Sequence, residues 1–237
     1  MLHHYKSEAS FAAYVIGISV LLGSLIISGT LYHTFKNNPA VQGGNGTPQA
    51  IGVQDASGKV AIKLPSNTPF LGNANAKVTV VEYADYRCPF CEKFFSSIMP
   101  DLQSKYIATG KIKFVYQDVS FLGPDSTTAG EAAYCATEQN KFWQFHDYVF
   151  AHQGNESTNW ASAPHMKQFA QALGLDTTAF NSCLDSGKYT KQVTADTSIA
   201  NANYKVTGTP TTFVNGTPII GAQPFSVFEQ AIDAALK

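Results

Sequence analysis

Two cysteines separated by two residues, Cys88 and Cys91, lie between a predicted strand and a predicted helix. The strand is indicated by Lys77 to Val81, a run rich in β-branched residues. A cysteine at the start of a helix has unpaired backbone N–H groups and the positive end of the helix dipole beside its sulfur, and both favour the thiolate. We therefore expect Cys88 to be a nucleophile, and Cys91, one helical turn later, to attack any mixed disulfide that forms at Cys88.

A Cys-x-x-Cys pair can also be half of a zinc site or an inert structural disulfide. The two remaining cysteines, Cys135 and Cys183, are not paired at short spacing. His146 and His152 are spaced like zinc ligands, but they lie far beyond the roughly 12–15 residues that separate the halves of such a site. A disulfide across two residues closes too small a loop to constrain an unfolded chain much. We therefore expect no metal, and no cofactor other than the redox-active cysteine pair itself.

Two further motifs accompany this pair. Glu82 stands six residues before Cys88, and Gly208-Thr209-Pro210 lies near the end of the chain. Together with Cys88-Pro89-Phe90-Cys91, they resemble the DsbA-like branch of the thioredoxin superfamily, over a stretch from about Leu71 to the C-terminus. The resemblance implies an α/β protein with a thioredoxin fold and an inserted helical subdomain. It also implies an enzyme, a thiol:disulfide oxidoreductase.

The resemblance implies roles for residues outside the cysteine pair. Glu82 would be a buried proton acceptor near Cys91, although a shift of one residue in strand register would turn it to solvent. The Thr209–Pro210 peptide bond would be cis and face the active-site disulfide, which would leave the Thr209 backbone free to pair with an extended substrate segment. An ordinary proline in a turn is the alternative.

The residues around Cys88 bear on the direction of electron flow. A stabilised thiolate makes the disulfide a stronger oxidant. Pro89 and Arg87 favour that state, whereas Phe90 stands where DsbA itself has a histidine. We therefore predict an oxidase that introduces disulfides into secreted or membrane proteins. The alternatives are a disulfide reductase or isomerase, and a redox-inactive peptide-binding or chaperone module.

The expected partners are unfolded or reduced proteins as substrates and a quinone-linked membrane reoxidase of the DsbB or VKOR type. Nucleic acid is not expected, because Arg87 is the only arginine and the lysines are scattered. Isomerases of the related DsbC type carry an N-terminal dimerisation domain, for which the tether at 36–68 has no room, and this argues against an isomerase. A monomer is expected.

The N-terminal part of the chain predicts a membrane anchor. No charged residue occurs from Ala9 to Phe35 if His33 is neutral, and the mostly apolar run from Phe11 to Tyr32 would make about 33 Å of helix. A cleaved signal peptide, the alternative, would have a shorter apolar core. Because Lys6 and Lys36 nearly balance, charge does not set the orientation. Cysteines arranged for disulfide chemistry indicate that the domain lies on the oxidising, extracytoplasmic side, in the cell envelope or periplasm.

The chain therefore divides into a short N-terminal segment at 1–10, a transmembrane signal anchor at 11–35, a flexible linker at 36–68 and a DsbA-like thioredoxin domain at 69–237. The linker is rich in Asn, Gly, Gln and Pro. Within it, Val60 to Leu64 predicts either a short strand at the edge of the domain or a solvated extension.

In the domain, the helix after the cysteine pair should be kinked at Pro100, and a second strand, parallel to the first, should run from Lys111 to Phe121. No strand pattern occurs from about 123 to 204, so this stretch predicts the inserted helical subdomain. The pair Asn215-Gly216 predicts a tight hairpin whose second arm, with Pro218, lies at a sheet edge. The remaining expected helices are 126–139, 142–152, 164–173, 178–184, 188–204 and a closing helix from near 224.

Cys135 and Cys183 both fall inside the predicted insertion. In an oxidising compartment two such cysteines more often pair than stay free, so a structural disulfide between them is expected. The alternative is two buried thiols that behave as small apolar residues.

Overall fold

The computed structural model describes residues 58–65 and 67–237. The predicted N-terminal segment, the membrane anchor and the linker up to residue 57 lie outside these residues. Within the described ranges, no helix is both long enough and apolar enough to cross a membrane.

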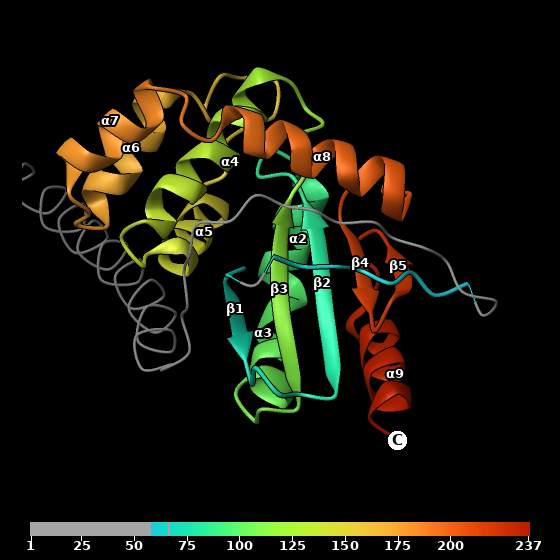
Figure 1. Ribbon diagram of the computed structural model, residues 1–237. Coiled ribbons are helices and arrows are strands. Elements are labelled where there is room, and N and C mark those ends of the chain that lie inside the picture. Colours follow the sequence, from blue (N-terminus) through green and yellow to red (C-terminus); the bar gives the residue numbers. More distant parts are fainter. Residues whose placement is uncertain (1–57, 66) are drawn as a thin grey trace, which may run out of the picture. The chain divides into compact units, whose positions relative to one another are not determined.

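A five-stranded sheet in the order β1-β3-β2-β4-β5 forms the centre of the domain (Figure 1). The strands are β1 (Phe70–Gly72), β2 (Val78–Ala84), β3 (Ile112–Asp118), β4 (Thr211–Val214) and β5 (Thr217–Ile220). β2 and β3 pair in parallel, with Glu82 beside Tyr116, and the other neighbours pair antiparallel. β2 is the central strand and is buried along almost its whole length, which explains its run of valines.

Helices cover both faces of this sheet (Figure 1). They include α2 (Pro89–Ser97) and α9 (Phe225–Leu236) on one face and α8 (Thr190–Tyr204) on the other. On the first face, the ring of Phe94 packs against those of Phe114 and Phe228. On the second face, Tyr204 packs against Tyr83 in a buried hydrophobic cluster. The start of α2 is thereby held directly above the buried end of β2.

The helix that follows the cysteine pair is interrupted near Pro100, as predicted. α2 ends at Ser97, and two short segments continue the path, α3 (Met99–Leu102) and the π-helical turn η1 (Gln103–Ile107). Pro100 lies at the start of α3, because its ring cannot be accommodated in the middle of a regular helix.

The helical insertion lies between β3 and β4. Its helices are α4 (Pro124–Thr137), α5 (Phe142–Ala151), α6 (Ala163–Ala172), α7 (Thr177–Asp185) and α8. Their positions agree with the predicted ones to within a few residues, and the predicted thioredoxin fold with a helical insertion is confirmed.

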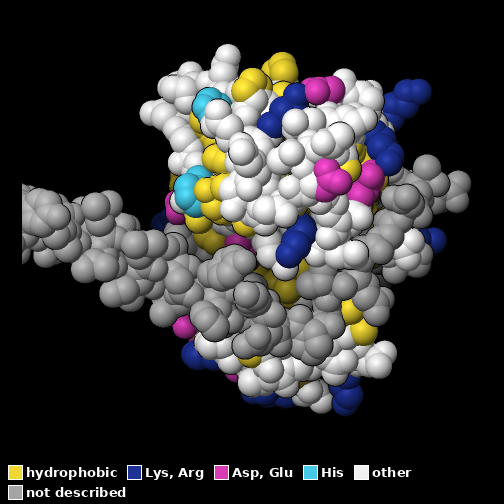
Figure 2. All heavy atoms as spheres, turned by 90° about the vertical axis from the view of Figure 1, so that its left-hand side faces the viewer, with side chains coloured by type: hydrophobic (Ala, Val, Ile, Leu, Met, Phe, Trp, Pro, Cys, Tyr) yellow, Lys and Arg dark blue, Asp and Glu magenta, His cyan; other side chains and the backbone are white. Residues whose placement is uncertain are grey.

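On the face of the molecule shown in Figure 2, the lysine and arginine side chains of the described residues are scattered among acidic and uncharged ones.

The segment at 58–65 combines features of both alternatives that the sequence left open. Val60 alone forms a strand-like bridge, several of its neighbours are exposed, and Ile62 and Leu64 pack against the hydrophobic cluster around α8. The Lys63 N–H donates a hydrogen bond to the Tyr204 hydroxyl (3.2 Å). Residues before 69 therefore pack on the domain, because these apolar side chains cover a sheet face that would otherwise be exposed.

The start of the segment at 58–65 is bonded to the tight turn between β4 and β5. Asn215 and Gly216 both have positive φ (45° and 84°), as a tight turn of this type requires. The Val60 N–H donates to the Gly216 carbonyl (2.9 Å). A Cβ at Gly216 would lie 2.3 Å from the Val60 carbonyl oxygen, so only glycine permits this approach.

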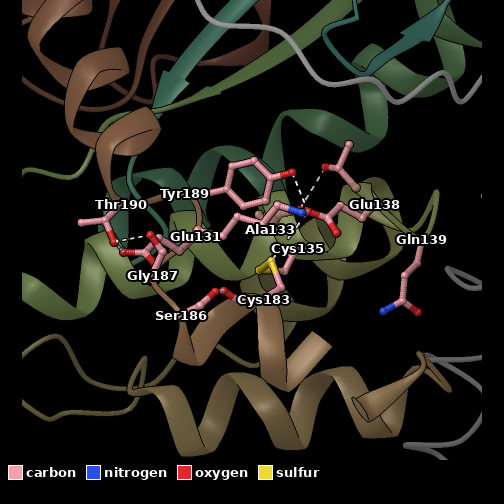
Figure 3. Close-up of a disulfide and its surroundings, with 12 residues drawn as sticks. Glu131, Ala133, Cys135, Glu138, Gln139, Cys183, Ser186, Gly187, Tyr189 and Thr190 are labelled. Atoms are coloured by element: carbon pink, nitrogen blue, oxygen red, sulfur yellow. Dashed lines mark hydrogen bonds and ion pairs between the residues drawn. A yellow bond between two sulfur atoms is a disulfide. The ribbon is translucent and has the colours of Figure 1, made fainter. Parts of the chain in front are cut away.

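Cys135 on α4 and Cys183 on α7 form a disulfide with an S–S distance of 2.05 Å (Figure 3). Both residues are buried. Beside them, Glu138 accepts hydrogen bonds from Lys188 (2.6 Å) and Tyr189 (2.7 Å), which joins α4 to the turn before α8. The bond and these contacts fasten α4, α7 and the turn before α8 to one another.

Replacing Cys135 and Cys183 together by serine should destabilise the protein. A loop of 48 residues restricts the unfolded chain by an amount equivalent to about 4 kcal/mol at most, before strain is subtracted. Thermal unfolding of the variant and the parent, each with Cys88 and Cys91 oxidised, measures the loss. The absorbance of the Cys88 thiolate against pH, recorded on the reduced forms, is the control and should not change. An unchanged melting temperature would contradict a structural role for this bond.

Candidate active site

Cys88 lies at the start of α2, at the carboxyl end of β2. Its carbonyl oxygen accepts hydrogen bonds from the N–H groups of Cys91 (3.0 Å) and Glu92 (3.1 Å), which begin the helix. Pro89 occupies the first turn, where a backbone N–H would have no helical partner in any case. Cys88 and Cys91 are both free thiols in this structure.

The surroundings of Cys88 favour its ionised form. Interaction with the Cys91 thiol lowers the pKa of Cys88 from 9.0 to about 6, and contacts with the Thr209 side chain and the backbone N–H groups of Cys91 and Phe90 act in the same direction. Partial burial opposes them. At neutral pH the sulfur is therefore mainly a thiolate, which is the reactive form in thiol–disulfide exchange.

Cys91 and Glu82 form the buried half of the site. Cys91 has no exposed surface, and Glu82 is 3% exposed. Burial raises the pKa of Cys91 well above its ordinary value, and the neighbouring Cys88 and Glu82 raise it further. Burial, followed by repulsion from Cys88, raises the pKa of the Glu82 carboxyl. A carboxyl with a raised pKa can hold a proton near neutral pH and exchange it with a neighbouring thiol.

The loop before β4 brings a distant part of the chain against Cys88. The Thr209–Pro210 peptide bond is cis. The Cys88 thiol donates to the Thr209 carbonyl oxygen at 3.4 Å, across 121 residues of sequence. Thr211 braces the same loop by donating from its hydroxyl to the Gly208 carbonyl (2.7 Å).

Arg87, expected from the sequence to favour the Cys88 thiolate, also has a set of hydrogen-bond partners of its own. Its guanidinium donates hydrogen bonds to the carbonyl oxygens of Leu122 (2.5 Å), Glu156 and Thr158 (3.2 Å). Arg87 thereby ties the turn before Cys88 to the loops that follow β3 and α5, because its fork of N–H donors can bridge several carbonyls at once.

Asp85, which the sequence analysis did not single out, organises the same turn. Its side chain is buried and accepts three backbone hydrogen bonds, from the N–H groups of Arg87 (2.8 Å), Phe121 (2.8 Å) and Leu122 (3.0 Å). Its carbonyl oxygen accepts from the Cys88 N–H (3.0 Å). An aspartate at the end of a buried strand, three residues before the first cysteine, was a signal available in the sequence.

Gln153, just after α5, was also missed. Its side-chain amide donates to the carbonyl oxygens of Tyr86 (2.8 Å) and Cys88 (3.1 Å), on either side of Arg87. No local pattern marks this glutamine, because its partners lie more than sixty residues earlier in the chain. It could be found only once the fold had placed α5 beside the active-site turn.

Exposed hydrophobic side chains surround the site. Phe90, inside the Cys-x-x-Cys motif, is 62% exposed, and Ile220, which pairs with Thr211 next to the cis proline, is 70% exposed. Leu122, held by Arg87 and Asp85, is 39% exposed. Apolar surface of this kind, next to a reactive sulfur, suits contact with an unfolded or flexible polypeptide.

Within residues 58–65 and 67–237, no group of three or more His, Cys, Asp or Glu side chains is placed to hold a metal ion.

Comparison with known proteins gives a consistent result. Residues 65–234 match the thioredoxin family model. A putative protein-disulfide oxidoreductase of Rickettsia bellii is 32% identical over 181 residues, which cover 76% of this chain and 68% of that protein. Disulfide bond formation protein D of Bacillus subtilis is 30% identical over 184 residues, which cover 76% of this chain and 81% of the relative. The solved structure of oxidised BdbD from Bacillus subtilis superposes with a TM-score of 0.68 at 27% identity, covering 80% of this chain and 99% of that one.

Titration of the reduced protein should show a thiolate with a midpoint near pH 6, well below the 9.0 of an ordinary thiol. The ultraviolet absorbance of the thiolate measures it directly. Cys88→Ser should abolish this transition, whereas Cys91→Ala, which removes the largest stabilising contact, should move the midpoint upward. A midpoint near 9 in the parent protein would contradict the assignment of Cys88 as the nucleophile.

Glu82 should make the reduced protein less stable as pH rises. The pKa of its carboxyl in the folded state lies above the ordinary value of 4.5 that it has in the unfolded chain, so the folded state holds an extra proton from about pH 4.5 upward. The contribution of Glu82 to the unfolding free energy then falls by about 1.4 kcal/mol per pH unit until the folded pKa is reached. Glu82→Gln should remove this share of the decline and leave the share of the other buried acids, Asp85, Asp118 and Asp196. Denaturant unfolding of the variant and the parent at about every pH unit between pH 4 and 8 measures the unfolding free energy of each and tests this expectation. Parallel curves for the variant and the parent would show that Glu82 does not carry the shift.

Proposed function

This chain belongs to the thioredoxin family and is a thiol:disulfide oxidoreductase of the DsbA type, and from this premise we propose that it is an oxidase, which introduces disulfides into reduced proteins. The observation that carries the direction is the low pKa of Cys88, about 6. A stable thiolate stabilises the reduced enzyme, which makes the Cys88–Cys91 disulfide a stronger oxidant. The name of the relative in Bacillus subtilis, disulfide bond formation protein D, agrees with this direction.

In the proposed reaction, a substrate thiolate attacks the Cys88 sulfur of the oxidised enzyme. The Cys88–Cys91 bond breaks, the electron pair goes to the Cys91 sulfur, and Glu82 supplies the proton that this buried sulfur takes up. A second substrate thiolate then attacks the substrate sulfur of the mixed disulfide and expels Cys88 as a thiolate. The substrate has lost two electrons and gained a disulfide, and the enzyme holds both electrons as its two reduced cysteines.

Substrate would bind as an extended segment beside the cis Thr209–Pro210 bond. The backbone of Thr209 lies against the Cys88 sulfur, so a peptide that paired with it would place its own cysteine next to the nucleophile. Phe90, inside the Cys-x-x-Cys motif, and Ile220, which pairs with Thr211, offer exposed apolar contacts. Contacts of this kind depend little on side-chain identity, which suits an enzyme that acts on many unfolded substrates.

We propose that the enzyme works outside the cytoplasm and is reoxidised by a quinone-linked membrane protein of the DsbB or VKOR type. The second disulfide, Cys135–Cys183, supports the location, because such bonds persist in oxidising compartments. Anchoring by the apolar segment at 11–35 would keep the domain near a reoxidase in the same membrane. The anchor, the division of the chain around it and the monomeric state stay predictions.

Equilibrating the full-length protein with glutathione buffers of graded potential should distinguish an oxidase from a reductase. We expect the Cys88–Cys91 couple to have a reduction potential above about −180 mV, the region of disulfide isomerase and DsbA, and not near the −270 mV of thioredoxin. Alkylation of free thiols followed by mass measurement reports the oxidised fraction. Catalysed oxidation of a reduced, unfolded protein is the matching activity, with Cys88→Ser as the inactive control. A potential below about −230 mV would favour a reductase.

A further inference from the structure

A proton must be transferred to and from the buried Cys91 thiol in each catalytic cycle. Cys91 has no exposed surface, and its high pKa means that it takes up a proton when the disulfide is reduced and must lose one when the disulfide is formed again. Glu82, its neighbour, is itself only 3% exposed. The proton therefore has to pass from this pair to solvent through other groups.

β3 carries two polar groups on the same face of the sheet as Glu82. In the parallel register, Glu82 lies beside Tyr116 and Ala84 lies beside Asp118. Registered residues of paired strands point to the same face, so Glu82, Tyr116 and Asp118 lie on one side of the sheet, and the Asp118 carboxyl lies against Gly130 of α4. The Tyr116 hydroxyl donates to the Ala84 carbonyl (3.2 Å), which places it between the positions of Glu82 and Asp118 along the strands.

The far end of this row reaches a pocket at the edge of β3. β1 pairs with β3 only over Lys113–Val115, so the edge from Tyr116 to Asp118 has no strand beside it. There a pocket of about 50 Å³ is lined by Tyr116, Asp118 and the exposed Asn67. At about 10–15 Å³ each, it has room for about three to five water molecules.

Asp118 is built to take part in such a path. It is only 7% exposed; its Oδ2 accepts a hydrogen bond from Ser120 (2.9 Å), and its Oδ1 is buried with no hydrogen-bond partner in the protein. A Cβ at Gly130 would lie 2.4 Å from Oδ2, so the glycine leaves space for the carboxyl. The titratable groups that act on it are all acids or phenols: Asp85, Tyr86, Tyr116, Tyr134 and Asp196. With no cation among these neighbours, the carboxyl binds a proton readily.

We propose that Tyr116 and Asp118 form a proton relay between the buried Cys91–Glu82 pair and the water in the pocket at the edge of β3. The hydroxyl of Tyr116 can accept a proton from one side and donate one to the other, and Asp118 exchanges with solvent. When the enzyme disulfide forms, the proton of Cys91 leaves through Glu82, Tyr116 and Asp118, and it returns along the same path on reduction. The proposal rests on the roles assigned above to Cys91 and Glu82.

The test isolates the step that involves Cys91. Reduced full-length protein is mixed with oxidised glutathione and quenched with acid at intervals, and mass measurement follows two species. Cys88 first forms a mixed disulfide with glutathione; Cys91 then loses its proton, attacks the Cys88 sulfur and releases glutathione. The relay acts only on the second step.

In Asp118→Asn and in Tyr116→Phe the mixed disulfide should form at the parent rate and close at least about tenfold more slowly, in the range of general acid–base effects. The control is Glu131→Gln. Glu131 is a buried acid on α4 that accepts a hydrogen bond from Thr190, and it is not among the groups that act on Asp118. This variant should close its mixed disulfide at the parent rate.

Chemical rescue distinguishes a proton-transfer role of Asp118 from a purely structural one. In Asp118→Ala the enlarged pocket should admit formate, which restores the closing rate, whereas formamide, a neutral molecule of the same shape, should not. Closure at the parent rate in Tyr116→Phe, or equal rescue by formamide and formate, would overturn the relay. Either result would leave the oxidase proposal intact, because the reduction potential is measured independently of the rate of closure.

Discussion

Charge buried in a low-dielectric interior is the constraint on which the rest of this site depends. A thiolate at Cys88 is tolerated because it lies at a helix start, beside backbone N–H groups and the Cys91 thiol. Cys91, less than one turn further into α2, has lost all contact with solvent, and its thiol resists ionisation. Two chemically identical side chains, three residues apart, thus acquire opposite tendencies: hydrogen-bond donors around Cys88 outweigh its partial burial, whereas full burial dominates at Cys91.

Because the two cysteines need different surroundings, the turn before α2 has to be held in one position. Asp85 binds backbone N–H groups from the turn and from the loop after β3, and Gln153 binds carbonyl groups from the turn. Arg87 donates hydrogen bonds to carbonyl oxygens of the loops that follow β3 and α5. The three side chains satisfy both donors and acceptors of an irregular backbone segment, so the position of Cys88 does not depend on contact with a substrate.

The protein keeps its two pairs of cysteines for different purposes. Cys88 and Cys91 lie beside a helix start that stabilises a thiolate, a buried acid and a loop with a cis proline. Cys135 and Cys183 are buried between α4 and α7, where Glu138 and its partners surround them. The first pair has the electrostatic setting for exchange, whereas the second joins helices of an insertion that has no strand of its own within the described residues.

The sequence by itself determined the parts of this protein that depend on short-range patterns. The β-branched run before Cys88, the position of the cysteine pair at a helix start, the helices of the insertion and the Asn215-Gly216 turn could all be predicted, because each follows from residues close together in the chain. Only the tertiary structure decided how Arg87 is used, since its carbonyl partners lie on loops 35 to 71 residues away. The same holds for Gln153 beside the active-site turn, for the segment at 58–65 across the sheet, and for the row from Glu82 to Asp118, which exists because two strands pair in one particular register. Contacts between distant segments leave no periodic pattern in the sequence, so their geometry appears only when the chain is folded.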